Sequence, residues 1–262
     1  MPAIRNVARE RLERGELSLG TGVRMTRSVE IAIAMKTAGF DWLFLDLEHG
    51  TMSIDAAAQI AVAALDAGIA PIVRVPNGEY SIATRLLDNG ALGIVMPHVD
   101  SAAEAHEVVQ KLKYPPIGHR SMGGIGPHYS LRTASTGEAA EALNAANLTV
   151  VMLETPKAIA NAEEIAAVPG VDVLLIGTND LCAEMGIPGD FGHDRVVDAY
   201  QRMIAASKKH GKFPGMAGIY NEPLMQRYIA MGARFILSGA DAAFLMASAT
   251  QRTSFLRTTL QS

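Results

Sequence analysis

The sequence of 262 residues contains a single cysteine, Cys182. One cysteine excludes an intramolecular disulfide and gives no thiolate cluster for a metal. Basic residues are not in excess either, because 23 lysines and arginines stand against 27 acidic residues, for a formal net charge of −4. The sequence therefore offers no basic patch that would indicate binding to nucleic acid, and no polybasic anchor for a membrane surface.

Long apolar runs are also missing. No stretch reaches the roughly 18 apolar residues that a membrane-spanning helix needs. The opening segment, MPAIRNVARERLERGE, is charged and lacks the apolar region of a signal peptide. We therefore expect a soluble, cytoplasmic protein. With 49% hydrophobic and 19% charged residues, the composition is that of a globular protein with a large core.

What the sequence does contain is a regular alternation of apolar, strand-length segments with segments of helical pattern. Several of the strand-length segments are apolar throughout, which is typical of parallel strands buried on both faces. Strands are expected at 17–23, 42–45, 71–75, 93–96, 149–154, 171–177, 212–216 and 233–239. The chain length and this alternation predict a (β/α)8 TIM barrel, with residues 1–262 forming a single domain.

Three connecting segments have features of their own. Ser28 is expected to cap a helix that runs to about residue 38, and one continuous helix is expected at 156–167. The segment YPPIGHRSMGGIGPHYS, within 114–148, is too long and too rich in proline and glycine for an ordinary connection. The last helix, at 240–260, carries Phe244, Leu245 and Phe255, whose apolar side chains suggest a contact with another subunit.

Polar residues follow several of these apolar strands, beginning with the segment GFDWLFLDLEHG at 39–50. In a (β/α)8 barrel the C-terminal ends of the strands meet at the active site. Charged groups at the end of a buried strand are costly unless they are paired or have a function. The strand ends carry Asp46, Glu48, His49, Arg74, His98, Glu154, Asn179 and Asp180.

Glu154 and Asp180 follow neighbouring strands, so their carboxylates are expected to lie side by side. Two oxygen ligands of this kind suit Mg²⁺ or Mn²⁺, which complete their coordination with water and substrate. Helix capping is the alternative interpretation. Thr155-Pro156 resembles an N-cap followed by a first-turn proline, and Asn179 or Asp180 could cap the next helix.

His49 and Asp46 could form a general base with its orienting carboxylate. A histidine bonded to a main-chain carbonyl is the alternative. Arg74 ends a buried strand and needs an anion or a carbonyl as partner, which could be a substrate, Glu48, or both. No lysine stands at the C-terminal end of a predicted strand, which argues against imine catalysis and for a metal.

Five motifs together resemble those of the HpcH/HpaI aldolases, which are metal-dependent class II pyruvate aldolases: GFDWLFLDLEHG, PIVRVP, LLDNGALGIVMPHV, VVMLET and LLIGTNDL. The resemblance extends from about residue 17 to 245. It implies a barrel of the phosphoenolpyruvate/pyruvate superfamily and reversible cleavage of 4-hydroxy-2-oxo acids to pyruvate or hydroxypyruvate and an aldehyde. It also implies a homo-oligomer, often a hexamer built as a dimer of trimers, in which the last helix packs on or is swapped with a neighbouring subunit.

The same resemblance implies roles for individual residues. Glu154 and Asp180 would bind Mg²⁺, Mn²⁺ or Co²⁺, Arg74 would stabilise the enolate, and His49, held by Asp46, would serve proton transfer. Asp88 would reach the site of a neighbouring subunit, and the amides at 178–180 would receive the substrate carboxylate. The expected substrate-binding residues are Arg74, Thr178, Asn179, Asp180, Asp88, Glu48 and Ser121. The loop PPIGHRSMGG and the pair Val23-Arg24 depart from the family pattern, and both concern the acceptor side.

Three other functions compete with this interpretation. The segments GMAG at 215–218 and LSGAD at 237–241 lie where many barrels bind phosphate, as a phosphosugar isomerase would. A related lyase could act on acyl-CoA or oxaloacetate-type substrates, although the sequence has no clear basic cluster for coenzyme A. A barrel without enzymatic activity would be expected to lack one or more of the polar residues at the strand ends, and all are present here.

Overall fold

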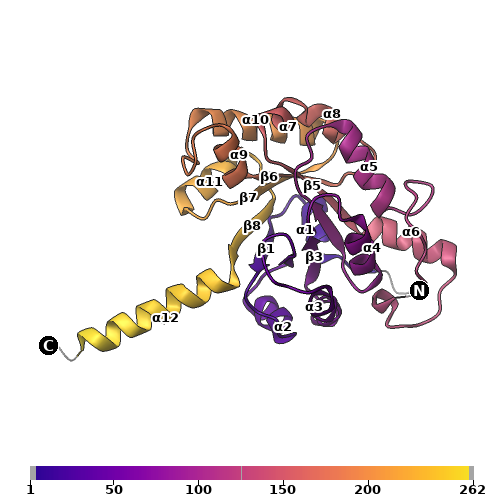
Figure 1. Cartoon of the computed structure of the whole chain (residues 1–262), viewed down its shortest axis with the longest axis horizontal. Helices are drawn as coiled ribbons and strands as arrows, with labels where there is room; N and C mark the ends of the chain where they lie inside the picture. The colour runs from indigo at the N-terminus through magenta and orange to yellow at the C-terminus, as the bar shows by residue number, and fades with distance from the viewer. Residues whose placement is uncertain (1–3, 125, 260–262) are drawn as a thin grey trace.

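The computed structural model describes residues 4–124 and 126–259. Eight parallel strands form a closed barrel in the order β1 to β8, surrounded by helices (Figure 1). The strands are β1 (Ser18–Val23), β2 (Trp42–Asp46), β3 (Ala70–Arg74), β4 (Gly93–Met96), β5 (Leu148–Leu153), β6 (Val173–Gly177), β7 (Phe213–Ala217) and β8 (Phe235–Ala240). The predicted (β/α)8 barrel is confirmed.

The helices lie on the outside of the barrel and alternate with the strands. They are α1 (Val7–Glu13), α2 (Glu30–Thr37), α3 (Ile54–Ala67), α4 (Tyr80–Asp88), α5 (Ala102–Leu112), α6 (Thr136–Ala146), α7 (Pro156–Ala160), α8 (Ala162–Ala167), α9 (Thr178–Glu184), α10 (Asp194–Lys209), α11 (Glu222–Met231) and α12 (Asp241–Thr258), with a 3₁₀ helix η1 at Pro127–Tyr129.

Alternate residues of each strand point to opposite faces, and this alternation explains the two cores of the protein. Trp42 and Phe44 of β2 belong to the core inside the barrel, whereas Leu43 and Leu45 belong to the core between barrel and helices. The next inward position on β2 is Asp46. On β3, Arg74 lies two residues after the inward-facing Ile72, and after β5 Glu154 lies two residues after the inward-facing Met152. Charged side chains therefore take the next inward-facing positions where these strands end.

The opposite end of the barrel is closed by aromatic packing. The indole of Trp42 stacks on the ring of Phe235, with centroids 4.0 Å apart. Gly20 makes this arrangement possible, because a Cβ atom at that position would lie 2.1 Å from the indole. The charged residues at the inward-facing positions lie at the other end of the barrel.

The structure differs from three expectations about local structure. The helix expected at 156–167 is interrupted at Asn161, whose side-chain amide donates to the Asp100 carbonyl at 2.8 Å. Ser28 does not cap α2, because the capping position is Val29 and no side chain bonds the helix start. The strand expected at 149–154 ends at Leu153, which leaves Glu154 on the connection beyond it.

The last helix, α12, projects away from the barrel (Figure 1). Its only buried residue among those described is Asp241, at the start of the helix. Large apolar side chains are exposed along the rest of it: Phe244, Leu245, Met246, Phe255 and Leu256.

Across the two described ranges, none of the helices has the length and apolar character that crossing a membrane requires.

Candidate active site

A cleft of about 210 Å³ opens at the C-terminal end of the barrel. It is lined by residues of seven of the strands and of the connections that follow them: Gly22, Arg24, Phe44, Asp46, His49, Arg74, Met152, Gly177, Thr178, Asn179, Asp180, Ala217, Gly218, Tyr220, Leu237, Gly239 and Ala240. Most of the polar side chains predicted from the strand ends are therefore brought together. Within the described ranges, no lysine lines this cleft.

Asp46 and Arg74 form the floor of the cleft. The Asp46 carboxylate accepts from Arg74 Nε at 3.0 Å and from Nη2 at 2.7 Å, and it also accepts from Arg24 Nε at 2.9 Å. Burial alone would raise the pKa of Asp46, but the bonds and charge of Arg74 outweigh it and the pKa is lowered. Asp46 is consequently a fixed anion that orients two guanidinium groups.

The remaining edge of Arg74 faces a second acid. Its Nη1 lies 3.0 Å from Glu48 Oε2, so the salt bridge considered from the sequence is present. The guanidinium also lies over the Phe44 ring, at 5.1 Å from the centroid. Arg74 is thereby held at the base of the cleft with 7% of its side chain exposed, and its charge is available to a substrate that enters there.

Glu154 is a buried acid whose charged form is disfavoured. Burial raises its pKa to about 7, and the nearby Asp180 carboxylate adds to the rise, although His98 opposes it. The main-chain N–H of His98 donates to Glu154 Oε2 at 2.8 Å, and its ring Nδ1 lies 3.3 Å from the same oxygen. A carboxylate with 1% of its side chain exposed, whose pKa a second carboxylate raises further, is a group whose charge a divalent cation would stabilise.

Gly177 leaves the space that Glu154 occupies. A Cβ atom at Gly177 would lie 2.5 Å from Glu154 Oε1, so a larger residue would displace the carboxylate. Asp180 lines the cleft, whereas Glu154 lies behind Gly177 and is not among the described lining residues, so the pair stays a prediction for a metal that takes two protein oxygens. In residues 4–124 and 126–259, no three His, Cys, Asp or Glu side chains are grouped closely enough to form a site made by protein alone.

The start of α9 forms another wall. Thr178 lines the cleft, but its hydroxyl is used internally, because Oγ1 donates to the Ala217 carbonyl at 2.7 Å and lies 2.8 Å from the Tyr200 hydroxyl. No side chain caps this helix. The part of residues 178–180 that faces a ligand is thus the main chain and the side chains of Asn179 and Asp180, which both line the cleft.

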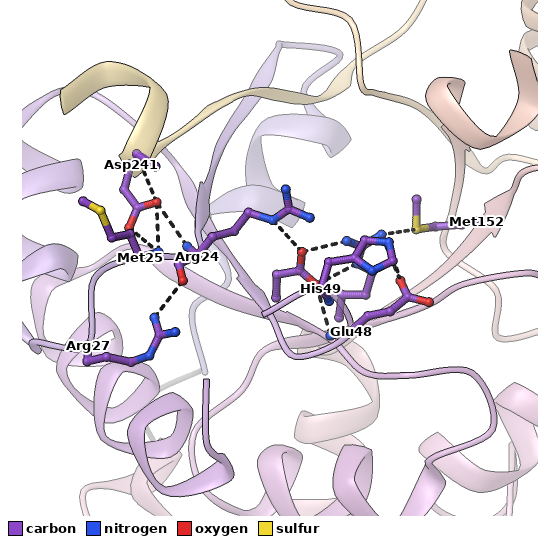
Figure 2. Close-up of polar contacts among 10 residues, drawn as sticks. Arg24, Met25, Arg27, Glu48, His49, Met152 and Asp241 are labelled. Atoms are coloured by element: carbon purple, nitrogen blue, oxygen red, sulfur yellow. Dashed lines mark hydrogen bonds and ion pairs between the residues drawn. The ribbon is translucent and has the colours of Figure 1, made fainter. Parts of the chain in front are cut away.

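The contacts of His49 differ from those predicted from the sequence. Asp46 was expected to hold the His49 ring, but in the described structure it accepts from the His49 main-chain N–H, at 3.2 Å. The ring lies instead near Glu48, with Nε2 3.9 Å from Oε2, and 55% of the side chain is exposed (Figure 2). The reason is that both Asp46 oxygens are already occupied by Arg74 and Arg24.

Asp88 and Ser121 are not among the residues that line this cleft within the described ranges. Asp88, at the end of α4, accepts from Arg120 Nη2 at 2.5 Å, and Arg120 belongs to the long loop that follows α5. Ser121 is exposed beside it. Their assignment as substrate-binding residues stays a prediction, and it requires a second subunit.

Sequence reasoning missed two contributions to the site. Tyr220 lines the cleft from the connection after β7, where no apolar strand end pointed to it. His98 was noted after its strand but received no role. It adopts a left-handed backbone conformation, with φ 52°, which directs its N–H at Glu154. The Pro97-His98 sequence gave no signal for that conformation.

Near the loops considered for phosphate binding, a carboxylate of the protein itself occupies a group of main-chain amides. The main-chain N–H groups of Arg24 and Met25 donate to the Asp241 carboxylate (Figure 2). The N–H of Thr26 donates to the same carboxylate, at 2.7 Å. Such a group of amides would suit an anion. A carboxylate of the protein already occupies these amides, whereas the loops at 215–218 and 237–241 contribute to the lining of the cleft.

The chain is similar to known proteins in sequence and in fold. The family model described as HpcH/HpaI aldolase/citrate lyase matches residues 26–247. The 4-hydroxy-4-methyl-2-oxoglutarate aldolase of Hapsidospora irregularis is 41% identical over 255 residues, which cover 96% of this chain and 94% of the relative. The hydroxypyruvate/pyruvate aldolase of Agrobacterium fabrum is 35% identical, with 92% and 90% covered. The crystal structure of an HpcH/HpaI aldolase from Desulfitobacterium hafniense matches with a TM-score of 0.91 at 27% identity, covering 97% of both chains.

Proposed function

Because this chain belongs to the HpcH/HpaI aldolase/citrate lyase family, we propose that it is a carbon–carbon lyase of the class II aldolase type. It cleaves 4-hydroxy-2-oxo acids to pyruvate or hydroxypyruvate and a carbonyl compound, and it catalyses the reverse addition. The names of its relatives, a 4-hydroxy-4-methyl-2-oxoglutarate aldolase and a hydroxypyruvate/pyruvate aldolase, support this substrate class. The observation that carries the proposal is the buried guanidinium of Arg74 beside the acids Glu154 and Asp180.

The reaction passes through an enolate, whose negative charge the site must stabilise. In cleavage, the C4 hydroxyl loses its proton, the C3–C4 bond breaks, and its electron pair passes to C3 and the C2 oxygen as an enolate. Protonation at C3 then gives pyruvate. Arg74, which Asp46 and Glu48 hold in place, is positioned to stabilise the enolate oxygen without rearranging. The alternative route through an imine needs a lysine, and the described residues that line the cleft include none.

Glu154 and Asp180 are the residues that would hold a divalent cation such as Mg²⁺, Mn²⁺ or Co²⁺. When bound, such a cation supplies a Lewis acid for the 2-oxo acid. The raised pKa of Glu154 and the space left by Gly177 support this assignment. The substrate carboxylate is assigned to the main chain at 178–180, where no side chain caps α9.

Proton transfer falls to His49. Its ring is half exposed and lines the cleft, so it can exchange protons with solvent while it faces a ligand. Asp46 positions the residue through its main-chain amide, and Glu48 lies near the ring. The role assigned to Asp46 is therefore to orient Arg74 and the 48–49 backbone, and the ring of His49 moves the proton.

Proton exchange tests this function. We would incubate the metal-loaded protein with pyruvate in D₂O and follow the methyl signal by NMR, with and without EDTA. Loss of the signal that depends on metal and is abolished in Glu154→Ala is expected. An exposed acid, Glu163→Ala, serves as the control variant. Exchange no faster than in buffer, with metal verifiably bound, would contradict pyruvate as the donor.

The assembly is part of the proposal. The exposed apolar side chains of α12 support a homo-oligomer in which this helix packs on or exchanges with a neighbouring subunit, and a hexamer is the assembly expected from the family resemblance. Analytical ultracentrifugation tests it, and a monomeric mass would contradict it. Placement in the cytoplasm stays a prediction from the sequence.

A further inference from the structure

Asp241, the first residue of α12, is a buried acid to which the proposed chemistry gives no role. It has 7% of its surface exposed. Its Oδ1 accepts from the main-chain N–H groups of Arg24 at 3.1 Å and Ala242 at 2.8 Å. Its Oδ2 accepts from those of Met25 at 3.1 Å and Thr26 at 2.7 Å. Burial would raise the pKa of Asp241, but the bonds from Thr26 and Arg24 outweigh it, and the pKa is lowered.

The connection that follows β1 depends on this carboxylate for its position. Arg24, Met25 and Arg27 are all exposed, so burial does little to fix the connection. Arg27 Nη1 donates to the Arg24 carbonyl at 2.8 Å, which only closes the segment on itself (Figure 2). The Nη2 of Arg27 donates to Thr51 Oγ1 at 3.1 Å, in an exposed contact. Hydrogen bonds from amides to a buried carboxylate are stronger, so Asp241 is the main anchor of this connection.

Asp241 is itself attached to the barrel through the first turn of α12. It follows directly on β8, which pairs with β1. Three residues further on, the ring of Phe244 lies against Gly239, where a Cβ atom would overlap it. The same ring stacks with that of Phe40, with centroids 6.0 Å apart. The carboxylate is therefore fixed relative to the barrel, although most of α12 is exposed.

The anchored main chain directs the Arg24 side chain at the floor of the cleft. Its Nε donates to Asp46 Oδ2 at 2.9 Å, and the same oxygen accepts from Arg74 Nη2 at 2.7 Å. Because 46% of the Arg24 side chain is exposed, ordering it costs rotamer entropy, and the bond would contribute little if the main chain were also free. Fixing the main chain of Arg24 lowers that cost.

We infer that Asp241 is a positioning residue of the active site, which holds the main chain of Arg24 and thereby fixes the Asp46 carboxylate that orients Arg74. Asp241 does not line the cleft, so it acts only through these side chains. The enolate charge that Arg74 stabilises develops only during the reaction. Loss of Asp241 should therefore lower kcat and kcat/KM by the same factor and leave the KM for pyruvate unchanged. This inference rests on the proposed function.

Chemical rescue tests this role. Asp241→Gly removes the carboxylate and leaves the amides of residues 24–26 able to bind a small anion. We would measure the exchange of pyruvate methyl protons by the metal-loaded, full-length protein. The kcat of exchange is expected to fall about 10- to 100-fold, as when a catalytic group is misplaced, and added formate should restore part of it. Sodium chloride at the same ionic strength, and formate added to the wild type, are the controls and should not raise the rate.

A double-mutant cycle tests the path through Arg24. Arg24→Met removes the bond to Asp46 and should itself lower kcat. In that background Asp241→Gly should cost less than about a further twofold, and formate should not restore the rate, because the two residues act as one unit. Asp198→Asn, which removes an exposed acid of α10, is the control and should keep the wild-type kcat.

The outcomes separate this inference from the proposed function. A wild-type kcat in Asp241→Gly, a kcat that formate does not raise, or equal losses with and without Arg24 would overturn the inference. If Asp241→Gly does not fold, Asp241→Asn replaces it in the cycle, because the amide keeps one acceptor but turns a donor toward the N–H groups. Additive losses in that cycle would overturn the inference as well. Absence of pyruvate exchange in the wild type would contradict the proposed function instead.

Discussion

Asp46 and Arg74 are register partners on the adjacent parallel strands β2 and β3, and their side chains meet in a two-point ion pair of 3.0 and 2.7 Å. Both are the last residues of their strands and both point into the barrel. The strand pairing itself therefore sets the geometry of the ion pair, and the guanidinium reaches the cleft already oriented.

Replacing Asp46 by Asn should destabilise the protein strongly. The amide would direct donors at Arg74 and Arg24, leaving a buried cation without its anion. We expect the free energy of unfolding to fall by about 3 kcal/mol, the range for breaking one side of a buried pair. Urea denaturation measures this. The exposed pair of Asp198 and Arg202 supplies the control, since Asp198→Asn should cost less than about 1 kcal/mol. Equally small decreases in the free energy of unfolding of the two variants would contradict the structural role of Asp46.

Arg74→Lys should fold but lose activity. A lysine has no planar fork, so it cannot bond Asp46 at two points and still direct a donor to Glu48 and the substrate. We expect kcat to fall about 100-fold or more, as when one donor to a developing oxyanion is removed. Steady-state cleavage assays and pyruvate proton exchange provide the two readouts. Arg195→Lys, on the exposed start of α10, is the matched control. Wild-type kcat in Arg74→Lys would exclude Arg74 from enolate stabilisation.

Metal binding should depend on pH through Glu154. Its pKa of about 7 means that a proton competes with the cation below that value, so the apparent affinity should fall about tenfold for each pH unit below 7 and level off above it. Calorimetric titration with Mn²⁺ between about pH 5.5 and 8 measures the slope. An affinity that does not change over this range would contradict the assignment.

The same pKa affects the stability of the metal-free protein. Between the ordinary value of 4.5 and about 7, the native protein retains a proton that the unfolded chain has lost, so stability should decrease as the pH rises through this window. Below 4.5 both states are protonated and the effect vanishes. Glu154→Gln should therefore gain stability relative to the wild type from pH 5 to 8, which thermal denaturation at each pH would detect. A difference between the two proteins that stays constant with pH would contradict it.

Gly177→Ala should disturb the acid pair without changing any charged residue. The added methyl group would lie 2.5 Å from Glu154 Oε1 and 2.9 Å from the Met152 methyl group, and both are held in a packed barrel. We expect metal affinity to fall at least about tenfold, as for other residues that position a ligand. Gly137→Ala, on α6, meets no atom within 4 Å and should bind metal as the wild type does. An unchanged metal affinity in Gly177→Ala would show that metal binding does not depend on the exact position of the Glu154 carboxylate.

The sequence predicted the barrel and the inward acids and arginine because both follow from local patterns. Asp46 and Arg74 continue the alternation of their strands, so their positions were fixed once the strands were recognised. The His49 ring lies beyond the end of β2, where the alternation of inward and outward side chains no longer applies. Its direction depends on the hydrogen bond from Arg24 to an Asp46 oxygen. The bonds from Asp241 to Arg24, Met25 and Thr26 join segments more than 200 residues apart, with separations of 215 to 217, and no local pattern could predict them.

The Asp241 carboxylate has a mechanical consequence. It belongs to the first residue of the helix that projects from the barrel, and it holds three amides of the loop that carries Arg24. The start of α12 and the loop at the rim of the cleft are therefore bonded to each other across the seam where β8 meets β1. A displacement of the start of α12 would move the loop that carries Arg24.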